Sequence, residues 1–187
     1  MTRNETAPAH STTQSGQSPV TITRANIDQL DELIAIRDEA TREMFALGPA
    51  DDISLLMEQT ATYYRHTLPT EEHIACLAML DGAVVGCGGV CLQDELPAPT
   101  NPTGACAFVQ NIYVRPAARH QGIASQMMSW LIDKAQAKGA IKVYLEASDS
   151  GAPLYSGLGF APMAGMMRLQ DEYVVAGAPM HRNAENA

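Results

Sequence analysis

Apolar residues follow two spacings along this chain, and together they predict a mixed α/β (α+β) domain over residues 20–175. Apolar residues that recur every three or four positions share one helix face, whereas short continuous apolar runs indicate buried strands. The first pattern predicts helices over 27–47, 51–68, 123–138 and 150–157. The second predicts strands over 20–24, 74–80, 83–92, 105–114, 142–147 and 166–169. This order indicates a mixed central sheet with helices on both faces.

Local signals mark where several of these elements begin and end. Asn26 is a suitable N-cap for the first helix, and Gly48–Pro49 ends it. Pro69 stops the second helix, because proline in a helix interior removes a backbone hydrogen bond. Gly139 suits the position after the third helix. Asp81–Gly82 joins two apolar runs, which predicts a β-hairpin.

The two hairpin strands are apolar on both faces, so we expect helices to cover the sheet on each side. Three glycines, Gly86, Gly88 and Gly89, lie within the second hairpin strand. They predict either a bulge or close backbone approach, or tight packing of a helix on the sheet. A proline-rich loop over 93–104 follows the hairpin.

Composition narrows the class of protein. The chain of 187 residues is 46% hydrophobic and 18% charged, which is enough apolar surface for one domain with a substantial core. The net charge of −9 argues against a nucleic-acid partner, because no basic stripe is present, and it is compatible with an amine-bearing substrate. Residues 1–19 and 176–187 are expected to be flexible tails.

The pattern of apolar runs and the use of cysteine predict a cytoplasmic location. The first 19 residues have no apolar core of a signal peptide, and no apolar run approaches the roughly 20 residues needed to cross a membrane. The four cysteines are Cys76, Cys87, Cys91 and Cys106. They form no Cys-x-x-Cys pair and no zinc-type cluster with histidine, so we expect buried, reduced thiols and no metal.

The most informative stretch is 111–124, where a strand, a turn and a helix N-terminus follow in order. The first N–H groups of a helix lack intrahelical partners, and the helix dipole adds positive charge, so this arrangement is a natural anion site. Gly122 lets the backbone approach a ligand closely, and Arg119 adds a guanidinium suited to phosphate oxygens. The stretch therefore predicts a pyrophosphate site.

The spacing Arg119-x-x-Gly122-x-Ala124, placed after the fourth large strand, resembles the acyl-CoA signature of the GNAT superfamily, the Gcn5-related N-acetyltransferases. One helix and one strand later, the segment 154–160 is similar to the family's Leu-Tyr-x-x-x-Gly-Phe pattern. The resemblance implies the GNAT acyl-CoA N-acyltransferase fold over 20–175. A Rossmann domain fits poorly, because Gly-x-Gly-x-x-Gly is absent, and a P-loop is excluded by the absence of Gly-Lys-Ser/Thr.

The resemblance also implies where acetyl-CoA binds, namely between the fourth and fifth strands. The implied cofactor-binding residues are Ile112, Tyr113, Val114, Arg119, His120, Gln121, Gly122, Ile123, Ala124, Ser125 and Ser148. The backbone of 112–114 would pair with the pantetheine arm, and that of the turn would hold the pyrophosphate. Ala124 replaces the commoner glycine, and Ser148 stands where many members have asparagine.

The implied chemistry is direct transfer of an acetyl group from the thioester to an amine. A backbone N–H of Ile112 or Tyr113 would stabilise the oxyanion, and Tyr155 would donate a proton to the departing thiolate. Glu146 is the candidate general base. Three alternatives stay open, namely the pair Glu72–His73 as base, a chain of water molecules, and an amine that arrives already neutral and needs no base.

The acceptor is the least determined part of the reaction. A small-molecule primary amine is the leading expectation, and a protein lysine or N-terminus is the second. A non-catalytic acyl-CoA-binding module is a third. By analogy with the family, Tyr63, Tyr64 and the first two helices would line the acceptor pocket. The family's frequent homodimers leave both a monomer and a homodimer open.

Overall fold

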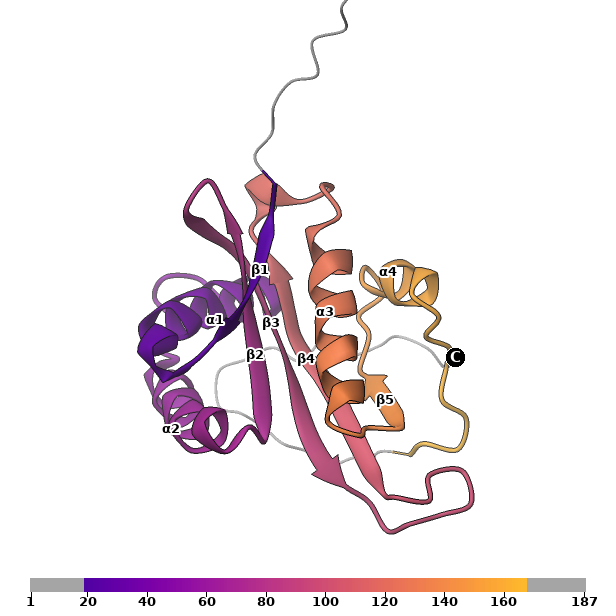
Figure 1. Cartoon of the computed structure of the whole chain (residues 1–187). Coiled ribbons are helices and arrows are strands. Elements are labelled where there is room, and N and C mark those ends of the chain that lie inside the picture. Colours follow the sequence, from indigo (N-terminus) through magenta and orange to yellow (C-terminus); the bar gives the residue numbers. More distant parts are fainter. Residues whose placement is uncertain (1–18, 168–187) are drawn as a thin grey trace, which may run out of the picture.

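The sheet at the centre of the molecule has the order β1-β2-β3-β4-β5 in the computed structural model, which describes residues 19–167. Its strands are β1 Thr21–Ala25, β2 His73–Leu80, β3 Ala83–Asp94, β4 Ala105–Val114 and β5 Lys142–Leu145. Neighbouring strands are antiparallel from β1 to β4, whereas β4 and β5 are parallel. The predicted mixed central sheet is therefore confirmed (Figure 1).

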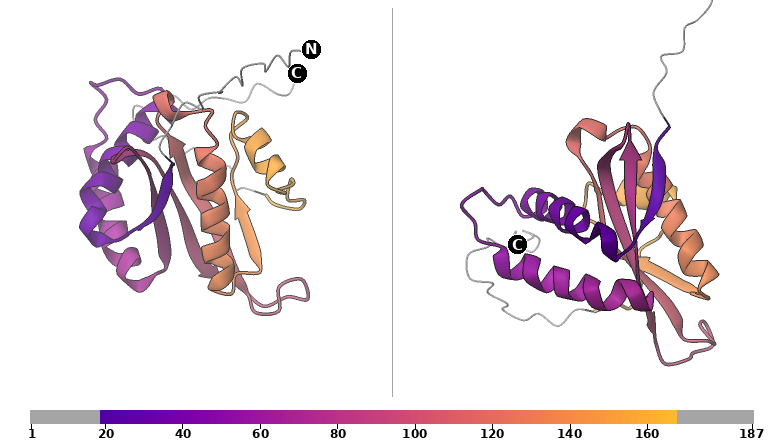
Figure 2. Two further views of the ribbon diagram at one scale, coloured as in Figure 1. Left: turned by 45° about the horizontal axis from the view of Figure 1, so that its top comes forward. Right: turned by 60° about the vertical axis from the view of Figure 1, so that its left-hand side comes forward.

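Helices cover both faces of this sheet, as predicted. The α-helices are α1 Leu30–Met44, α2 Ser54–Thr70, α3 Ile123–Ala137 and α4 Ala152–Gly157. Two short 3-10 helices are labelled η1 Ile27–Gln29 and η2 Pro116–Ala118. Figure 2 shows α1 and α2 on one face and α3 and α4 on the other. No helix of the described residues combines the length and apolarity needed to cross a membrane.

Each face of the sheet has its own apolar core. The buried residues on the α1/α2 face are Ala25, Leu33, Ile36, Tyr64, Leu68, Ala75, Leu77 and Cys87. Those on the α3 face include Ile74, Cys76, Ala78, Val90, Ala107, Val109, Ile123, Met127, Met128 and Leu131. Strands β2 and β3 contribute side chains to both cores, so they are apolar on both faces. Burying each large apolar side chain contributes about 1.5–3 kcal/mol to stability. All four cysteines are free thiols, and Cys91 alone among them is only half-buried.

The β2–β3 hairpin shows why β3 carries so many glycines. Asp81 and Gly82 have φ of +51° and +77°, as a type I′ turn requires at both central positions. A Cβ on Gly86 would lie 2.8 Å from the Tyr113 carbonyl oxygen. A Cβ on Gly89 would lie 2.2 Å from His73 Nε2. Close approach of neighbouring groups on the sheet therefore requires these glycines.

The first helical segment begins as predicted but in two steps. The Asn26 side chain accepts a hydrogen bond from Asp28 N at 2.7 Å, and Gln29 Oε1 accepts one from Asn26 N at 3.0 Å. This capping box supports η1, and α1 follows it directly. The predicted helix extended to Leu47, but α1 ends at Met44, whose side chain is exposed.

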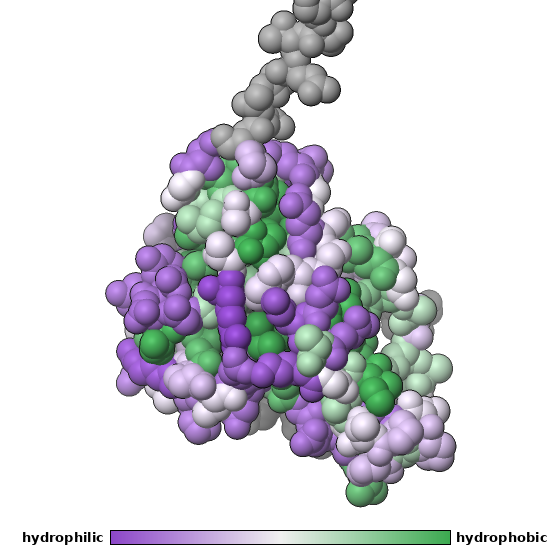
Figure 3. All heavy atoms as spheres, in the orientation of Figure 1, coloured by the Kyte–Doolittle hydropathy of each residue, from purple (hydrophilic) through white to green (hydrophobic). Residues whose placement is uncertain are grey.

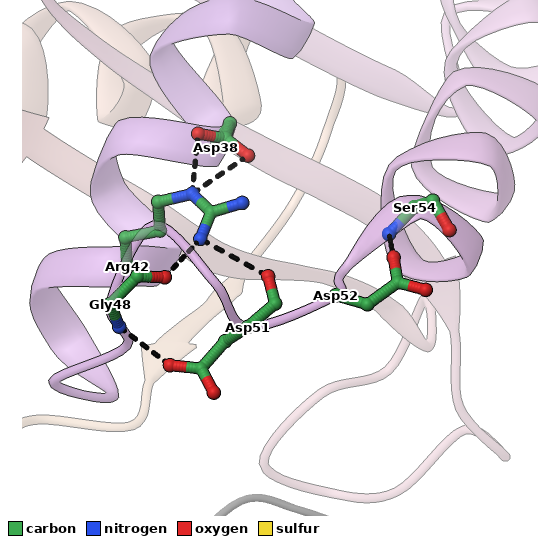
Figure 4. Close-up of polar contacts among 6 residues, drawn as sticks. All are labelled: Asp38, Arg42, Gly48, Asp51, Asp52 and Ser54. Atoms are coloured by element: carbon green, nitrogen blue, oxygen red, sulfur yellow. Dashed lines mark hydrogen bonds and ion pairs between the residues drawn. The ribbon is translucent and has the colours of Figure 1, made fainter.

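Polar contacts in the α1–α2 loop explain why α2 starts late. We predicted a start near Asp51 or Asp52, whereas α2 begins at Ser54. The Asp52 carboxylate accepts from Ser54 N at 2.9 Å, and Arg42 Nη1 donates to the Gly48 carbonyl at 2.7 Å (Figure 4). Both aspartates are used to close the loop, so they precede the helix.

Two further boundaries differ from the predictions. Pro69 does not stop α2, which continues to Thr70, because a proline this close to the helix end removes little of the ladder. Strand β5 ends at Leu145, two residues short of the predicted end. The strand predicted over 166–169 is not formed at 166–167, and its other residues lie outside the described part. The predicted tails also lie outside it, apart from residue 19.

Candidate active site

The segment between β4 and α3 has the strand–turn–helix form that the sequence predicted. After η2, an exposed turn leads to Gly122, and α3 begins at the next residue. His120 and Gly122 have left-handed backbone conformations with φ of +61° and +73°. Among the described residues, no atom lies within 4 Å of the position that a Cβ on Gly122 would take. The first N–H groups of α3 have no intrahelical acceptor, so the turn can receive an anion from solvent.

Arg119 is engaged by protein groups. Its Nε donates to the Val114 carbonyl at 2.8 Å, and its Nη2 donates to Glu43 Oε1 at 2.5 Å. The other oxygen of Glu43 accepts from the Tyr113 hydroxyl at 3.1 Å. Arg119 therefore ties the turn to the C-terminal end of α1. The backbone of the turn, more than this guanidinium, is open to an anion.

The pairing between β4 and β5 is short. Only Cys106–Val109 of β4 pairs with Lys142–Leu145 of β5. Strand β4 continues to Val114, whereas β5 ends at Leu145. In the described chain no strand follows this edge of β4 beyond Val109, and an unpaired edge can bind an extended ligand as an added strand. Ile112, Tyr113 and Val114, predicted to contact the cofactor arm, lie in this stretch.

A β-bulge interrupts the same stretch of β4. The ladder pairs on either side of it are Cys87 with Tyr113 and Gly89 with Gln110. Gly88 of β3 therefore faces two residues of β4, Asn111 and Ile112. Asn111 has φ of +59°, a left-handed conformation. The extra residue reverses the alternation of side chains, so that Ile112 packs in the α3 core.

Contacts on both faces of the sheet hold this bulge. On the α1/α2 face, Arg37 Nη1 donates to Asn111 Oδ1 at 2.8 Å. Asn111 Nδ2 lies 3.4 Å from Cys87 Sγ, and that thiol lies 3.6 Å from the Asn111 carbonyl oxygen. On the opposite face, a Cβ on Gly88 would lie 2.6 Å from Ile112 Cδ1, so Ile112 packs closely over this glycine.

Neither Arg37 nor Asn111 received a role from the sequence. One signal was available for the bulge, since Gln110 and Asn111 are two consecutive polar residues inside an otherwise apolar strand. Regular alternation cannot place both neighbours on one face, and a bulge resolves this conflict. No local signal indicates Arg37, because it lies 74 positions from Asn111 along the chain.

Tyr155 approaches the sheet from the α4 side. Its ring packs edge-on against Phe160, with centroids 6.1 Å apart, and burial raises the pKa of its hydroxyl above the ordinary value. Ser148 Oγ accepts from Gly151 N at 3.2 Å, so this side chain supports the start of α4. Glu146 follows the last residue of β5 and is exposed.

An apolar groove of about 770 Å³ lies between α3, β5 and α4. Its lining includes Ile132, Val143, Leu145, Tyr155, Leu158, Phe160 and Met163. Figure 3 shows hydrophobic residues reaching the surface around α4, on this side of the molecule. The residues of the turn before α3 do not line this groove.

The α1/α2 face carries a row of side chains across four strands. In ladder register the row is His73, Cys91, Phe108 and Tyr144. The Phe108 and Tyr144 rings lie 5.2 Å apart, and Tyr63 from α2 lies over His73 with its hydroxyl 3.1 Å from Nδ1. This face therefore offers an aromatic and polar surface beside the end of the β4–β5 pairing.

His73 and Glu72, the alternative candidates for the base, lie in contrasting environments. His73 is 2% exposed, and burial lowers its pKa to about 4, so the imidazole is neutral at physiological pH. Its Nε2 has no hydrogen-bond partner among the described residues. Glu72 is exposed beside His66, with 3.8 Å between carboxylate and Nε2. Within residues 19–167, no three His, Cys, Asp or Glu side chains gather as a metal site.

Known proteins match this chain in sequence and in structure. A family model described as "Acetyltransferase (GNAT) family" matches residues 33–160. Glucosamine 6-phosphate N-acetyltransferase from Trypanosoma brucei brucei is 30% identical over 88 residues, which are 47% of this chain and 58% of that protein. The chain thus spans only a little over half the length of this relative.

Solved structures share the fold. A predicted acetyltransferase from Clostridium acetobutylicum, solved with acetyl-CoA, has a TM-score of 0.73 at 24% identity and covers 81% of this chain and 96% of its own. An aminoglycoside N-acetyltransferase in complex with CoA has a TM-score of 0.66 at 17% identity, with coverages of 85% and 99%.

Proposed function

Because the chain belongs to the GNAT acetyltransferase family, we propose that it moves the acetyl group of acetyl-CoA to a primary amine of a small molecule by direct attack. One observation carries the proposal. The end of the β4–β5 pairing, the bulge of β4 and the turn before α3 follow one another in this order along a single strand and its connection to α3. An extended thioester with a pyrophosphate at one end suits this order.

The residues of the turn and of β4 fit acetyl-CoA. The N–H groups around Gly122 would donate hydrogen bonds to the pyrophosphate oxygens, because they are open to solvent and lie at the positive end of the α3 dipole. The backbone of 112–114 would pair with the pantetheine arm. Bound acetyl-CoA supplies an activated acetyl group as a thioester.

Stabilisation of negative charge on the carbonyl oxygen falls to β4. The bulge lies beside the proposed position of the thioester, and the N–H of Ile112 or Tyr113 would donate to the reacting carbonyl oxygen. A donor that is fixed before the reaction lowers the barrier without reorganisation. This assignment gives the bulge a chemical purpose.

Tyr155 would protonate the departing thiolate. Burial raises its pKa, so the phenol keeps its proton at neutral pH, whereas an ordinary thiol has a pKa of about 8.5. Tyr155 comes from the α4 side of the sheet, and the row with His73 lies on the opposite face. The amine and the leaving group would therefore approach the thioester from opposite sides.

Glu146 remains our candidate base. It is exposed next to the end of β5 and can take the amine proton directly or through water. His73 is less suited, because burial lowers its pKa to about 4 and places it beneath Tyr63. Ser148 is the remaining candidate for a hydrogen bond to the cofactor arm.

A small amine is favoured as acceptor by the relative found by sequence, which is named as an amino-sugar N-acetyltransferase. The test is a screen of the full chain with acetyl-CoA, measured by thiol release and by mass spectrometry of the products. Amino sugars, aminoglycosides, polyamines and lysine or N-terminal peptides are compared side by side. We expect the highest kcat/KM with a small amine. Transfer to peptides alone, or thioester hydrolysis alone, would overturn the proposal.

A further inference from the structure

We propose that Arg37 is a positioning residue for acetyl transfer, because it holds the side chain of Asn111 and thereby fixes the bulge of β4. The inference rests on the proposed function. It gives α1, through the contact of Arg37 with Asn111, control over the backbone of β4 at the peptide that joins Asn111 to Ile112.

The bulge depends on an unusual backbone conformation. Asn111 has φ of +59°, and the first residue of this kind of bulge is commonly a glycine, because only glycine adopts left-handed φ without steric cost. Asparagine tolerates the conformation better than most residues, but it still needs surrounding contacts to persist. The structure must therefore stabilise Asn111 from outside the strand.

Three contacts do so, and the charged one comes from Arg37. Its Nη1 donates to Asn111 Oδ1 at 2.8 Å, and Cys87 contacts the other side of the same residue through Sγ. A hydrogen bond from a charged donor contributes about 1.5–3 kcal/mol, more than a neutral one. Thiol contacts are weaker, so Arg37 makes the strongest of these three contacts.

The acidic residues of α1 next to Arg37 form ion pairs with other arginines, so the Arg37 side chain makes its polar contact with Asn111. The neighbouring acidic residues Asp38, Glu39 and Glu43 are paired with Arg42, Arg115 and Arg119, in that order. Arg37 is half-buried and makes no ion pair with any described residue. Its charge is directed instead to a neutral amide on the sheet.

The opposite face of the sheet completes the clamp. Ile112 is lodged in the α3 core against Gly88, where a Cβ would come within 2.6 Å of it. With Ile112 fixed from one side and Asn111 from the other, the peptide between them has one orientation. Loss of Arg37 removes the charged contact from one of the two sides and leaves only the thiol contacts of Cys87 there.

A double-mutant cycle on the full chain tests the inference. The proteins are the wild type, Arg37→Met, Asn111→Gly and the double variant. Glycine adopts φ of about +60° without help, so it should make Arg37 dispensable. We expect Arg37→Met to lower kcat about 10- to 100-fold, as for misplaced catalytic groups, with acetyl-CoA affinity within about threefold. In the Asn111→Gly background, the same substitution should change kcat less than about threefold.

Two further variants guard against a general loss of structure. Arg37→Lys keeps a donor for Asn111 and should recover part of kcat. Arg42→Met removes another arginine of α1, whose bonds close the α1–α2 loop, and should leave kcat within about threefold. An equal loss of kcat from Arg37→Met in both backgrounds would overturn the inference, since Arg37 would then act on the reacting groups directly.

A readout without turnover separates this inference from the proposed function. Amide hydrogen exchange of residues 110–114 should be faster in Arg37→Met than in the wild type, and restored toward wild type in the double variant. Unchanged exchange in Arg37→Met would overturn the inference even if an acceptor is known. If no amine is acetylated by any variant, the proposed function fails, and the exchange result still decides the role of Arg37.

Discussion

The turn before α3 is built differently from the region beyond Val109, where β4 no longer pairs with β5 and which we call the β4–β5 gap. The turn consists of consecutive residues, and the groups it offers to a ligand are backbone N–H groups. Around the gap, the candidate groups are side chains on separate elements, with Tyr155 on α4 on one side of the sheet and Tyr63 with His73 on the other. A backbone site needs only a short motif, whereas a side-chain site is specified by contacts between distant segments.

The difference predicts how each region responds to substitution. Replacing side chains in the turn should matter little unless the backbone conformation changes. Replacing single side chains around the gap should have large and specific effects.

Tyr155→Phe should have the largest effect. Loss of the phenolic proton should lower kcat by about 100-fold or more, the usual contribution of general acid catalysis, with CoA affinity unchanged within about threefold. Steady-state kinetics and calorimetric titration with CoA measure the two quantities. Phe160→Leu is the matched control, because it disturbs the ring contact with Tyr155 and keeps the hydroxyl. Equal kcat for Tyr155→Phe and wild type would remove Tyr155 from the mechanism.

His73 should make the protein sensitive to acid. Burial lowers its pKa to about 4, below the ordinary value of 6.5, so the unfolded chain binds more protons between these values. The stability present above pH 6.5 is then lost as the pH falls toward 4, by about 3 kcal/mol in total.

Urea unfolding at several pH values measures this dependence. His73→Leu should reduce the slope of the unfolding free energy between pH 6.5 and 4. The same slope in His73→Leu and wild type would show that His73 does not remain neutral in the folded protein.

Gly122→Ala should weaken CoA binding about tenfold, because a left-handed conformation costs a non-glycine residue about 1–2 kcal/mol and the turn must relax. Gly139→Ala is the matched control. Gly139 also has a positive φ, +88°, and open space around it, but it follows the far end of α3. Both variants should lose similar stability, and only the first should lose affinity. Equal CoA affinity in the two would contradict the proposed site.

His120→Ala and Gln121→Ala should have the smallest effects. Both side chains are exposed, and the turn is proposed to bind through its backbone, so CoA affinity should stay within about twofold. Calorimetric titration is again the measurement. A loss of tenfold or more in either variant would show that the turn, like the gap, depends on its side chains.

The sequence predicted what is local in this molecule. The strand–turn–helix form around Gly122 and the hairpin at Asp81–Gly82 depend on neighbouring residues, and both are present. Helix ends were less predictable. Asp52 could belong to a helix or to a loop, and the bonds that Arg42 and Asp52 make in the loop decide in favour of the loop.

The clamp on the bulge could not be predicted in the same way. Asn111 lies in the stretch that the sequence singled out, but its conformation depends on Arg37 and Cys87, which are 74 and 24 positions away. The groups around His73 likewise meet only when α2 packs on the sheet. The spacing of residues along the sequence does not indicate such contacts between distant segments.

The short pairing between β4 and β5 also has a mechanical consequence. With four residues of each strand paired, this seam is the weakest lateral connection of β4, whose other edge pairs with β3 over most of its length. A cofactor arm that pairs with the open edge of β4 would strengthen the connection between β4 and β5. Because the ligand binds the folded state, the free energy of unfolding should rise with ligand concentration. The ligand would then be a structural part of the sheet, and thermal denaturation would report its presence even when no acceptor is supplied.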